Sequence, residues 1–175
     1  MSAKRQVTSG LCLLSAIAMT AYARFVWGPA HGPVPGTIAR VGKPLPRLPV
    51  VDASGRPVDA AKDAMGSRSV IAFYSASCRV CQVVLPQMRP FPPELRLFLI
   101  NEESNDSLMD LGALGFEKAV LYRDPHRVLA RSFPMCGVPT ILFVDERGIL
   151  RDGMVGEHAR GQVQKKLREF ARERP

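Results

Sequence analysis

The sequence predicts an α/β domain built on a central mixed sheet with helices on both faces. Three observations lead to this fold class. Apolar, β-rich runs alternate with helical segments through the middle of the chain, as in parallel strands that are joined by helices. A turn at residues 145–148 joins two further runs into an antiparallel hairpin. An amphipathic segment then closes the chain, and its apolar side can cover the sheet.

Length and composition fit one such domain and a leader. The chain has 175 residues, of which 46% are hydrophobic and 23% are charged. Its net charge is +8, but the basic residues are spread along the chain, aromatic residues are sparse and no nucleic-acid-binding motif is present. We therefore expect no nucleic-acid partner. Solubility, or attraction to an anionic membrane surface, is enough to explain the charge.

Residues 1–27 are expected to form a signal anchor or a signal peptide. Lys4 and Arg5 precede an apolar run at residues 11–23, which is the arrangement of an export signal. The tripeptide Ala-Tyr-Ala at 21–23 fits a cleavage site. Residues 25–27, in contrast, can extend the run toward the ~20 residues that a membrane-spanning helix needs. Both outcomes stay open, and retention is slightly favoured.

The two basic residues predict that the N-terminus stays inside the cell. The expected location is the bacterial inner membrane, as a single-pass protein with a periplasmic domain. If the signal is cleaved after Ala23, the expected location is the periplasm. Residues 28–39 are rich in proline and glycine and predict an extended tether. The globular domain is expected to span residues 40–175.

The first elements of this domain are short. Residues 48–52 predict a strand, residues 53–55 a turn and residues 56–58 the returning segment. Residues 59–65 predict a short helix or a loop. Residues 70–74 are apolar and β-rich, so we expect them to form a central, buried strand.

A helix is expected directly after this strand. Pro86 should bend it, because proline removes one N–H group and clashes with the preceding turn. Pro90, Pro92 and Pro93 should end it. Residues 95–101 are almost all apolar, as in a strand that is buried on both faces.

Helices and strands alternate through the remaining chain. Asp106 can cap a helix that ends near Leu114, and a short strand follows at residues 119–122. Asp124 can cap the next helix, with Pro125 at its first position.

The hairpin and the last helix complete the sheet. Residues 140–144 and 149–155 predict its two strands, and residues 159–172 predict the closing helix. Val163, Leu167 and Phe170 fall at helical spacing, so one side of this helix should pack on the sheet.

Two cysteines follow the central strand at Cys78 and Cys81. At the start of a helix, unpaired N–H groups and the positive end of the helix dipole favour a thiolate. Cys78 would be the exposed attacking sulfur, and Cys81, one turn further, could close a disulfide with it. Zinc binding and inert packing are the alternatives. The other cysteines and histidines lack the paired spacing of a second half-site, so we expect no metal and no cofactor.

Pro139 enters a run that otherwise reads as a central strand, which needs a reason. We expect a cis Val138–Pro139 bond, which would leave the backbone of Val138 free to pair with an extended substrate next to Cys78. Thr140 and Cys136 flank this bond and are further candidates for substrate binding. The alternative is a trans proline that marks the start of a strand.

Together these motifs resemble the thioredoxin fold, and the resemblance covers residues 40–170. It rests on the Cys-x-x-Cys helix that contains Pro86, on Gly-Val-Pro-Thr at 137–140 and on Phe-Val-Asp-Glu-Arg-Gly at 143–148. The leader, the lead-in Val-Gly-Lys-Pro-Leu-Pro at 41–46 and the turn at 52–58 are similar to the membrane-anchored TlpA/ResA/CcmG branch. They are also similar to the methylamine-utilisation factor MauD.

The resemblance implies a function and roles for three residues. Cys78 would be the nucleophile, Cys81 the resolving thiol and Pro139 the cis-proline. The expected activity is extracytoplasmic thiol–disulfide exchange on exported proteins, for example in the maturation of cytochrome c or another envelope protein. The expected partners are exported proteins with thiols or disulfides, a membrane electron donor or acceptor, and the membrane itself through the N-terminal helix.

The chain departs from the family pattern at four positions. Ser77 stands where the family usually has tryptophan, and Val84 stands where cytochrome-maturation members carry glutamate. Ala72 replaces the buried aspartate of cytoplasmic thioredoxins, so the usual carboxylate for moving a proton off the buried thiol is missing. Cys136 is an additional cysteine. It could form an alternative disulfide, hold a trapped substrate or simply fill the wall of the groove.

Arg79 and Val80, between the two cysteines, are expected to tune the redox chemistry. A cation at Arg79 should stabilise the Cys78 thiolate and therefore the reduced form. We expect a potential that is less reducing than the value of about −270 mV for thioredoxin.

Two other functions are alternatives. Ser75-x-x-Cys78 resembles the peroxiredoxin motif of a thiol peroxidase, but Ile71 stands where that motif has proline. A Sco-like copper chaperone would have one more residue between its cysteines and a partner histidine, for which His126 is the candidate.

Overall fold

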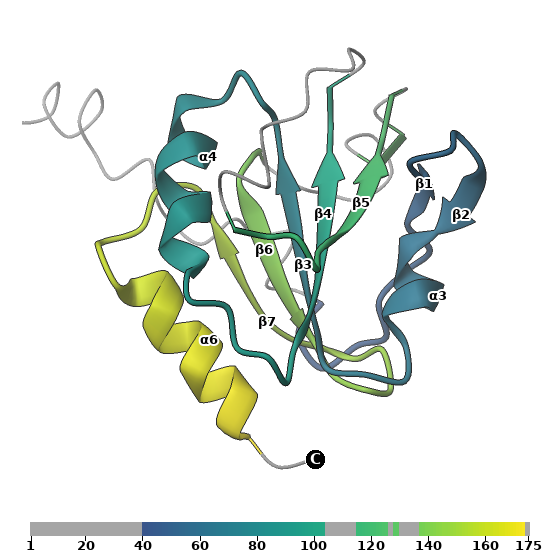
Figure 1. The fold of residues 1–175 in the computed structure, drawn as a ribbon. Helices are drawn as coiled ribbons and strands as arrows, with labels where there is room; N and C mark the ends of the chain where they lie inside the picture. Colours follow the sequence, from purple (N-terminus) through teal and green to yellow (C-terminus); the bar gives the residue numbers. More distant parts are fainter. Residues whose placement is uncertain (1–39, 104–114, 126–127, 130–136, 174–175) are drawn as a thin grey trace, which may run out of the picture. The chain divides into compact units, whose positions relative to one another are not determined.

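Seven strands form one mixed sheet in the order β2-β1-β5-β4-β3-β6-β7 (Figure 1). The structure is a computed structural model, and it describes residues 40–103, 115–125, 128–129 and 137–173. The strands are β1 (Pro49–Val51), β2 (Pro57–Asp59), β3 (Ser69–Tyr74), β4 (Arg96–Asn101), β5 (Val120–Arg123), β6 (Thr140–Val144) and β7 (Leu150–Val155). The helices are α3 (Ala60–Ala64), α4 (Arg79–Val84) and α6 (Gln162–Arg172), with a 3-10 helix η1 (Leu85–Met88). The predicted fold class is confirmed.

Strand β3 lies near the centre of the sheet. It pairs in parallel with β4, where Tyr74 lies opposite Asn101, and antiparallel with β6, where Phe73 lies opposite Thr140. All six residues of β3 are buried, as the unbroken apolar run predicts. The C-terminal ends of β3 and β4 and the N-terminal end of β6 therefore meet at one edge of the sheet.

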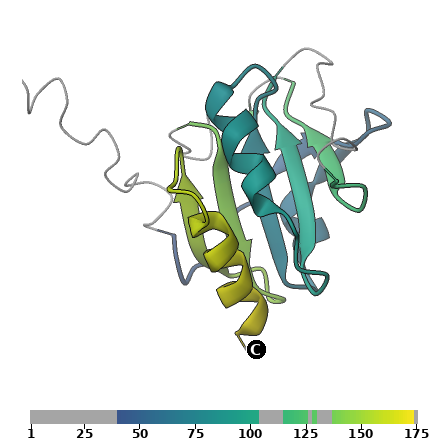
Figure 2. The ribbon, with the colours of Figure 1, turned by 60° about the vertical axis from the view of Figure 1, so that its left-hand side comes forward.

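Helices cover both faces of the sheet. Val70, Ala72 and Tyr74 alternate with their neighbours along β3 and pack in one core cluster, to which α4, η1 and α6 contribute. Figures 1 and 2 show α4 and α6 on the same face. Ile71 and Phe73 point the other way, into a second cluster that includes the alanines of α3.

The helix after β3 changes type at the position where proline predicts a bend. Helix α4 ends at Val84, and η1 continues it through Pro86 to Met88. Pro86 cannot donate an N–H to the preceding turn, so the α-helical ladder stops there. The prolines at 90, 92 and 93 lie beyond the end of this helix, as expected, in a bend and a turn in which the N–H of Leu95 donates to the carbonyl oxygen of Pro92 at 3.2 Å.

The closing helix starts later than the sequence predicts. Helix α6 begins at Gln162 rather than at residue 159, because Gly161 has a positive φ of 84° and interrupts the helical backbone. Val163, Leu167 and Phe170 are buried on its inner side, which confirms the predicted apolar face.

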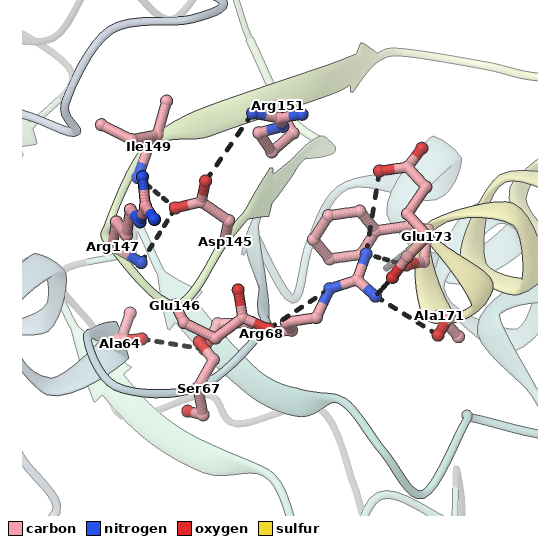
Figure 3. Close-up of polar contacts among 12 residues, drawn as sticks. Ala64, Ser67, Arg68, Asp145, Glu146, Arg147, Ile149, Arg151, Ala171 and Glu173 are labelled. Carbon is pink, nitrogen blue, oxygen red and sulfur yellow. Dashed lines mark hydrogen bonds and ion pairs between the residues drawn. The ribbon is translucent and has the colours of Figure 1, made fainter. Parts of the chain in front are cut away.

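In the hairpin before α6, the Asp145 carboxylate accepts hydrogen bonds from the backbone N–H groups of Arg147 and Ile149 (Figure 3).

Arg68, just before β3, holds the end of α6. Its guanidinium donates to the carbonyl oxygens of Phe170, Ala171 and Glu173. It also lies 4.3 Å from the centre of the Phe170 ring and 3.8 Å from a carboxylate oxygen of Glu146 (Figure 3). A charged donor thus satisfies the carbonyls that the last turn of a helix leaves without partners.

Several predictions fall on residues that the structure does not describe. They are the leader at 1–27, the tether at 28–39, the helix at 106–114 and most of the helix after Asp124. The Asp124 carboxylate does accept hydrogen bonds of 2.8 Å from the N–H groups of Val128 and Leu129, as a capping side chain would. Within the described ranges, no helix is both long and apolar enough to cross a membrane.

Candidate active site

Cys78 lies at the end of the turn that follows β3. Its N–H donates to the carbonyl oxygen of Ser75 at 3.2 Å, and Cys78 is the N-cap residue of α4. Its Sγ accepts a hydrogen bond of 3.2 Å from the N–H of Cys81. The strand–turn–helix context inferred from sequence is therefore present, and an N–H donor faces the sulfur that would carry negative charge.

Cys81 is fully buried, whereas Cys78 is only partly buried. Burial, with a smaller contribution from the neighbouring Cys78 side chain, raises the pKa of the Cys81 thiol to about 12. Cys81 thus stays protonated at neutral pH, and Cys78 is the sulfur that solvent and substrates can reach. This asymmetry is what an attacking thiol and a resolving thiol need.

The loop before β6 reaches the same place. The Val138–Pro139 peptide bond is cis, as expected, and the Cys78 thiol donates to the carbonyl oxygen of Val138 over 3.6 Å. Thr140 is buried, and its hydroxyl donates to the carbonyl oxygen of Gly137 at 2.7 Å. We therefore expect Thr140 to affect substrate binding only through the conformation of this loop.

The residues between the cysteines have different environments. Arg79 is exposed, and Val80 packs against the core cluster that contains Cys81. Ala72 stands at the position of the buried aspartate of cytoplasmic thioredoxins, and it is buried in the same core cluster as Cys81. Its side chain is a methyl group, so it supplies no carboxylate beside the buried thiol.

Sequence reasoning missed one carboxylate near the site, that of Glu103. Oε1 of Glu103 accepts a 2.9 Å hydrogen bond from the N–H of Ser77 and further hydrogen bonds from the hydroxyls of Ser75 and Ser77. These donors, led by the Ser75 hydroxyl, lower the pKa of Glu103. The only available signal was its place in the sequence, because Glu103 directly follows the buried strand that was predicted at residues 95–101.

Tyr74, the last residue of β3, is a second missed residue. Its side chain is fully buried in the cluster that contains Cys81, and its hydroxyl has no hydrogen-bond partner among the described residues. Burial, followed by the charge of Glu103, raises the pKa of Tyr74 to about 12. Tyr74 is therefore a neutral phenol under ordinary conditions.

Two cavities share Arg89, the residue after η1, in their linings. One, of about 790 Å³, lies between Val83 and Pro86 on one side and the loop around His158 on the other. Burial lowers the pKa of His158. Arg89, Glu157 and Arg160 also line this cavity, so its walls carry charges of both signs. The other cavity, of about 820 Å³, is lined by residues at the start of β4 and β5. It lies away from Cys78, because β3 and β4 are parallel and Cys78 follows their C-terminal ends.

Two candidate residues lie outside the described ranges, namely Cys136 and His126. Their expected parts in an alternative disulfide and in copper binding are untested. Among the residues that the structure describes, no three His, Cys, Asp or Glu side chains come together in a way that could hold a metal ion.

Comparison with known proteins supports the fold. No protein-family model matches the chain, and no curated protein matches it. Solved structures do match. One is a protein assigned as the thiol:disulfide interchange protein DsbE of Chlorobium tepidum, with a TM-score of 0.60 and 18% identity over 75% of this chain and 96% of that one.

Two further structures match over similar lengths. The thio-disulfide isomerase of Thermus thermophilus has a TM-score of 0.52 and 22% identity, over 74% of this chain and 96% of its own. The exposed lipoprotein thioredoxin of Streptococcus pneumoniae has a TM-score of 0.51 and 15% identity, over 71% of this chain and 99% of its own. The chain therefore has the thioredoxin-like fold that the motifs predicted.

Proposed function

We propose that this protein is an extracytoplasmic thiol–disulfide oxidoreductase of the TlpA/ResA/CcmG type that acts on exported proteins through Cys78 and Cys81. One observation carries the proposal. The Cys78 sulfur lies 3.2 Å from the N–H of the buried Cys81 and 3.6 Å from the carbonyl oxygen of Val138, at the end of the sheet where the two segments meet. Similarity to solved thiol–disulfide exchange proteins supports the same activity.

The chemistry follows from the unequal exposure of the two sulfurs. The Cys78 thiolate attacks a substrate disulfide, forms a mixed disulfide and releases one substrate thiolate, which takes up a proton. Cys81 then loses its proton and attacks Cys78, which closes the Cys78–Cys81 bond and releases the second substrate thiol. The substrate gains two electrons and two protons. The protein supplies both electrons, the proton of Cys81 and, through solvent, the proton that Cys78 released when it ionised. In the opposite direction, a substrate dithiol reduces the Cys78–Cys81 disulfide.

A redox titration against glutathione tests the activity. We expect the wild-type protein to form the Cys78–Cys81 disulfide reversibly, and we expect Cys78→Ser and Cys81→Ser variants to lose it. Measuring free thiols by mass after acid quenching gives the equilibrium constant directly. If the wild-type protein forms no such disulfide at any glutathione ratio, the proposed activity is wrong.

The substrate class can be tested in intact cells. A Cys81→Ala variant lacks the resolving thiol, so substrates should remain attached to Cys78 as mixed disulfides that a reducing agent releases. The matched control is Cys78→Ala/Cys81→Ala, which should trap nothing. We expect the trapped partners to be exported proteins, such as apocytochrome c, and a membrane electron donor or acceptor. If only cytoplasmic proteins were trapped, the proposed compartment would be contradicted.

Two observations support the proposed compartment, one from the leader and one from a similar protein. The basic residues before the apolar run at 11–23 favour export of the domain, and the similar pneumococcal thioredoxin is an exposed lipoprotein. We expect protease added to spheroplasts to digest the domain, whereas a cytoplasmic marker survives. Full protection of the domain until the inner membrane is lysed would place it inside the cell instead.

A further inference from the structure

The turn that carries Cys78 is held from a neighbouring strand rather than by aromatic packing. Ser77, directly before Cys78, occupies the position at which the fold usually has tryptophan, and its side chain is small and exposed. Its N–H and its hydroxyl both donate to Oε1 of Glu103. The Ser75 hydroxyl donates to the same oxygen and lies 3.0 Å from the Ser77 hydroxyl.

Strand pairing fixes the position of Glu103. The N–H of Glu102 donates to the carbonyl oxygen of Tyr74 at 2.9 Å, which extends the β3–β4 pairing to the start of the turn. The N–H of Glu103 donates to the side chain of Asn101 at 3.0 Å. The carboxylate is therefore presented to the turn from the segment directly after β4, which is hydrogen-bonded to the end of β3.

Hydrogen bonds to residues 75–77 in this turn then fix the position of Cys78. The carbonyl oxygen of Ser75 accepts the N–H of Cys78 at 3.2 Å, and the carbonyl oxygen of Ala76 accepts the side-chain amide of Gln82 at 3.1 Å. Displacing Ser75 or Ser77 would thus move Cys78 relative to Cys81 and Val138. Hydrogen bonds to an ionised acceptor are stronger than neutral ones, which makes Glu103 the main anchor.

We propose that Glu103 is a positioning residue for thiol–disulfide exchange, which holds the Ser75–Ser77 turn so that Cys78 stays within bonding range of Cys81. The proposal rests on the activity proposed above and adds to it a residue that touches neither sulfur. An intramolecular disulfide is stable in proportion to the effective concentration of its two thiols. Loosening the turn lowers that concentration, so the disulfide becomes easier to reduce.

The test is the equilibrium constant for forming the Cys78–Cys81 disulfide against glutathione in the full-length protein. Glu103→Ala removes the acceptor, and we expect the constant to fall about tenfold. Glu103→Gln removes the charge but keeps an oxygen acceptor, and we expect its constant to stay within about threefold of the wild-type value. The double variant Ser75→Ala/Ser77→Ala keeps the charge and the Ser77 N–H bond, and we expect a fall of about threefold.

A purely electrostatic effect of Glu103 would give a different pattern. Removing a negative charge near Cys78 stabilises its thiolate, so Glu103→Gln would then shift the constant as far as Glu103→Ala. The double serine variant, which leaves the carboxylate less neutralised, would shift it in the opposite direction. Either result overturns the proposal.

A purely structural effect is separated by thermal unfolding. If Glu103 only supported the fold, Glu103→Ala would lower Tm equally in the oxidised and reduced forms and leave the equilibrium constant unchanged, which also overturns the proposal. We expect the oxidised form to lose more stability than the reduced form. If Glu103→Ala does not fold, the comparison of Glu103→Gln with the double serine variant decides alone. A wild-type protein that forms no disulfide would instead defeat the proposed function.

Discussion

The two cysteines differ most in how far their thiols are exposed to solvent. Cys81 is fully buried and its pKa is raised to about 12, whereas Cys78 is partly exposed. In the reduced protein we expect iodoacetamide to modify Cys78 first. In a Cys78→Ser variant, Cys81 should react at least about tenfold more slowly than an unfolded thiol at neutral pH. Mass analysis of the labelled peptide measures both rates, and equal rates would contradict the burial of Cys81.

The raised pKa of Cys81 also predicts how pH changes stability. An unfolded thiol titrates near pH ~8.5, whereas the folded thiol holds its proton up to about 12. The stabilisation is therefore complete below the unfolded pKa and is lost as pH rises toward the folded pKa. Between these limits, a Cys78→Ser protein should lose up to about 1.4 kcal/mol of unfolding free energy per pH unit. Urea titrations against Cys78→Ser/Cys81→Ala as the reference isolate this effect.

Arg79 is predicted to shift the redox potential only slightly. Its side chain is exposed, so solvent screens its interaction with the Cys78 thiolate. We expect Arg79→Gln to slow alkylation of Cys78 about twofold and to make the disulfide harder to reduce by a similar factor. Raising the salt concentration should remove the difference. A change that persists in high salt would mean that Arg79 acts through contacts and not through its charge.

At the scale of single residues, only part of the candidate site could be predicted from the sequence. Cys78, Cys81 and the cis Val138–Pro139 bond were predictable, because each belongs to a short local pattern. Glu103 was not, because its hydrogen bond to Ser77 joins positions that are 26 residues apart. Only the parallel pairing of β3 and β4 brings these two segments together.

Among the elements, α6 depends on one distant side chain. Arg68 is 13% exposed and donates to backbone carbonyls at the end of α6, from a position about a hundred residues earlier. We expect Arg68→Met to cost about 2–3 kcal/mol of unfolding free energy, because three carbonyls lose a charged donor. Urea denaturation measures the loss. Arg147→Ala, an exposed arginine in the neighbouring hairpin turn, is the control and should change stability by less than about 0.5 kcal/mol.

The bounds of the elements show which local signals were sufficient. The apolar run of β3 and the spacing of Val163, Leu167 and Phe170 predicted their elements correctly. The start of α6 was placed too early, because Gly161 permits a positive φ but does not require one, so the break was not predicted from its presence alone. The 3-10 helix at Pro86 agrees with the predicted bend, because the missing N–H of proline is a purely local property.

At the scale of the whole molecule, the segment that opens the described domain is anchored to the hairpin of β6 and β7. The first described residues are tied to the hairpin, since the N–H of Gly42 donates to Leu150 and the N–H of Leu45 donates to Gly148, each at 2.8 Å. A fragment of residues 40–175 should therefore unfold in one cooperative transition. Its glutathione equilibrium constant should lie within about twofold of that of the full chain. Circular dichroism and thiol titration test this; a fragment without a cooperative transition would show that the leader or tether is needed for folding.

The strand order also makes β2 and β7 the two edge strands of the described sheet. On one side β2 begins with Pro57, which has no N–H to offer a further strand, and on the other side β7 carries Arg151 and Asp152. Both features discourage the recruitment of another chain along the sheet. At high concentration, copies of this protein can therefore collide often without polymerising through their sheets.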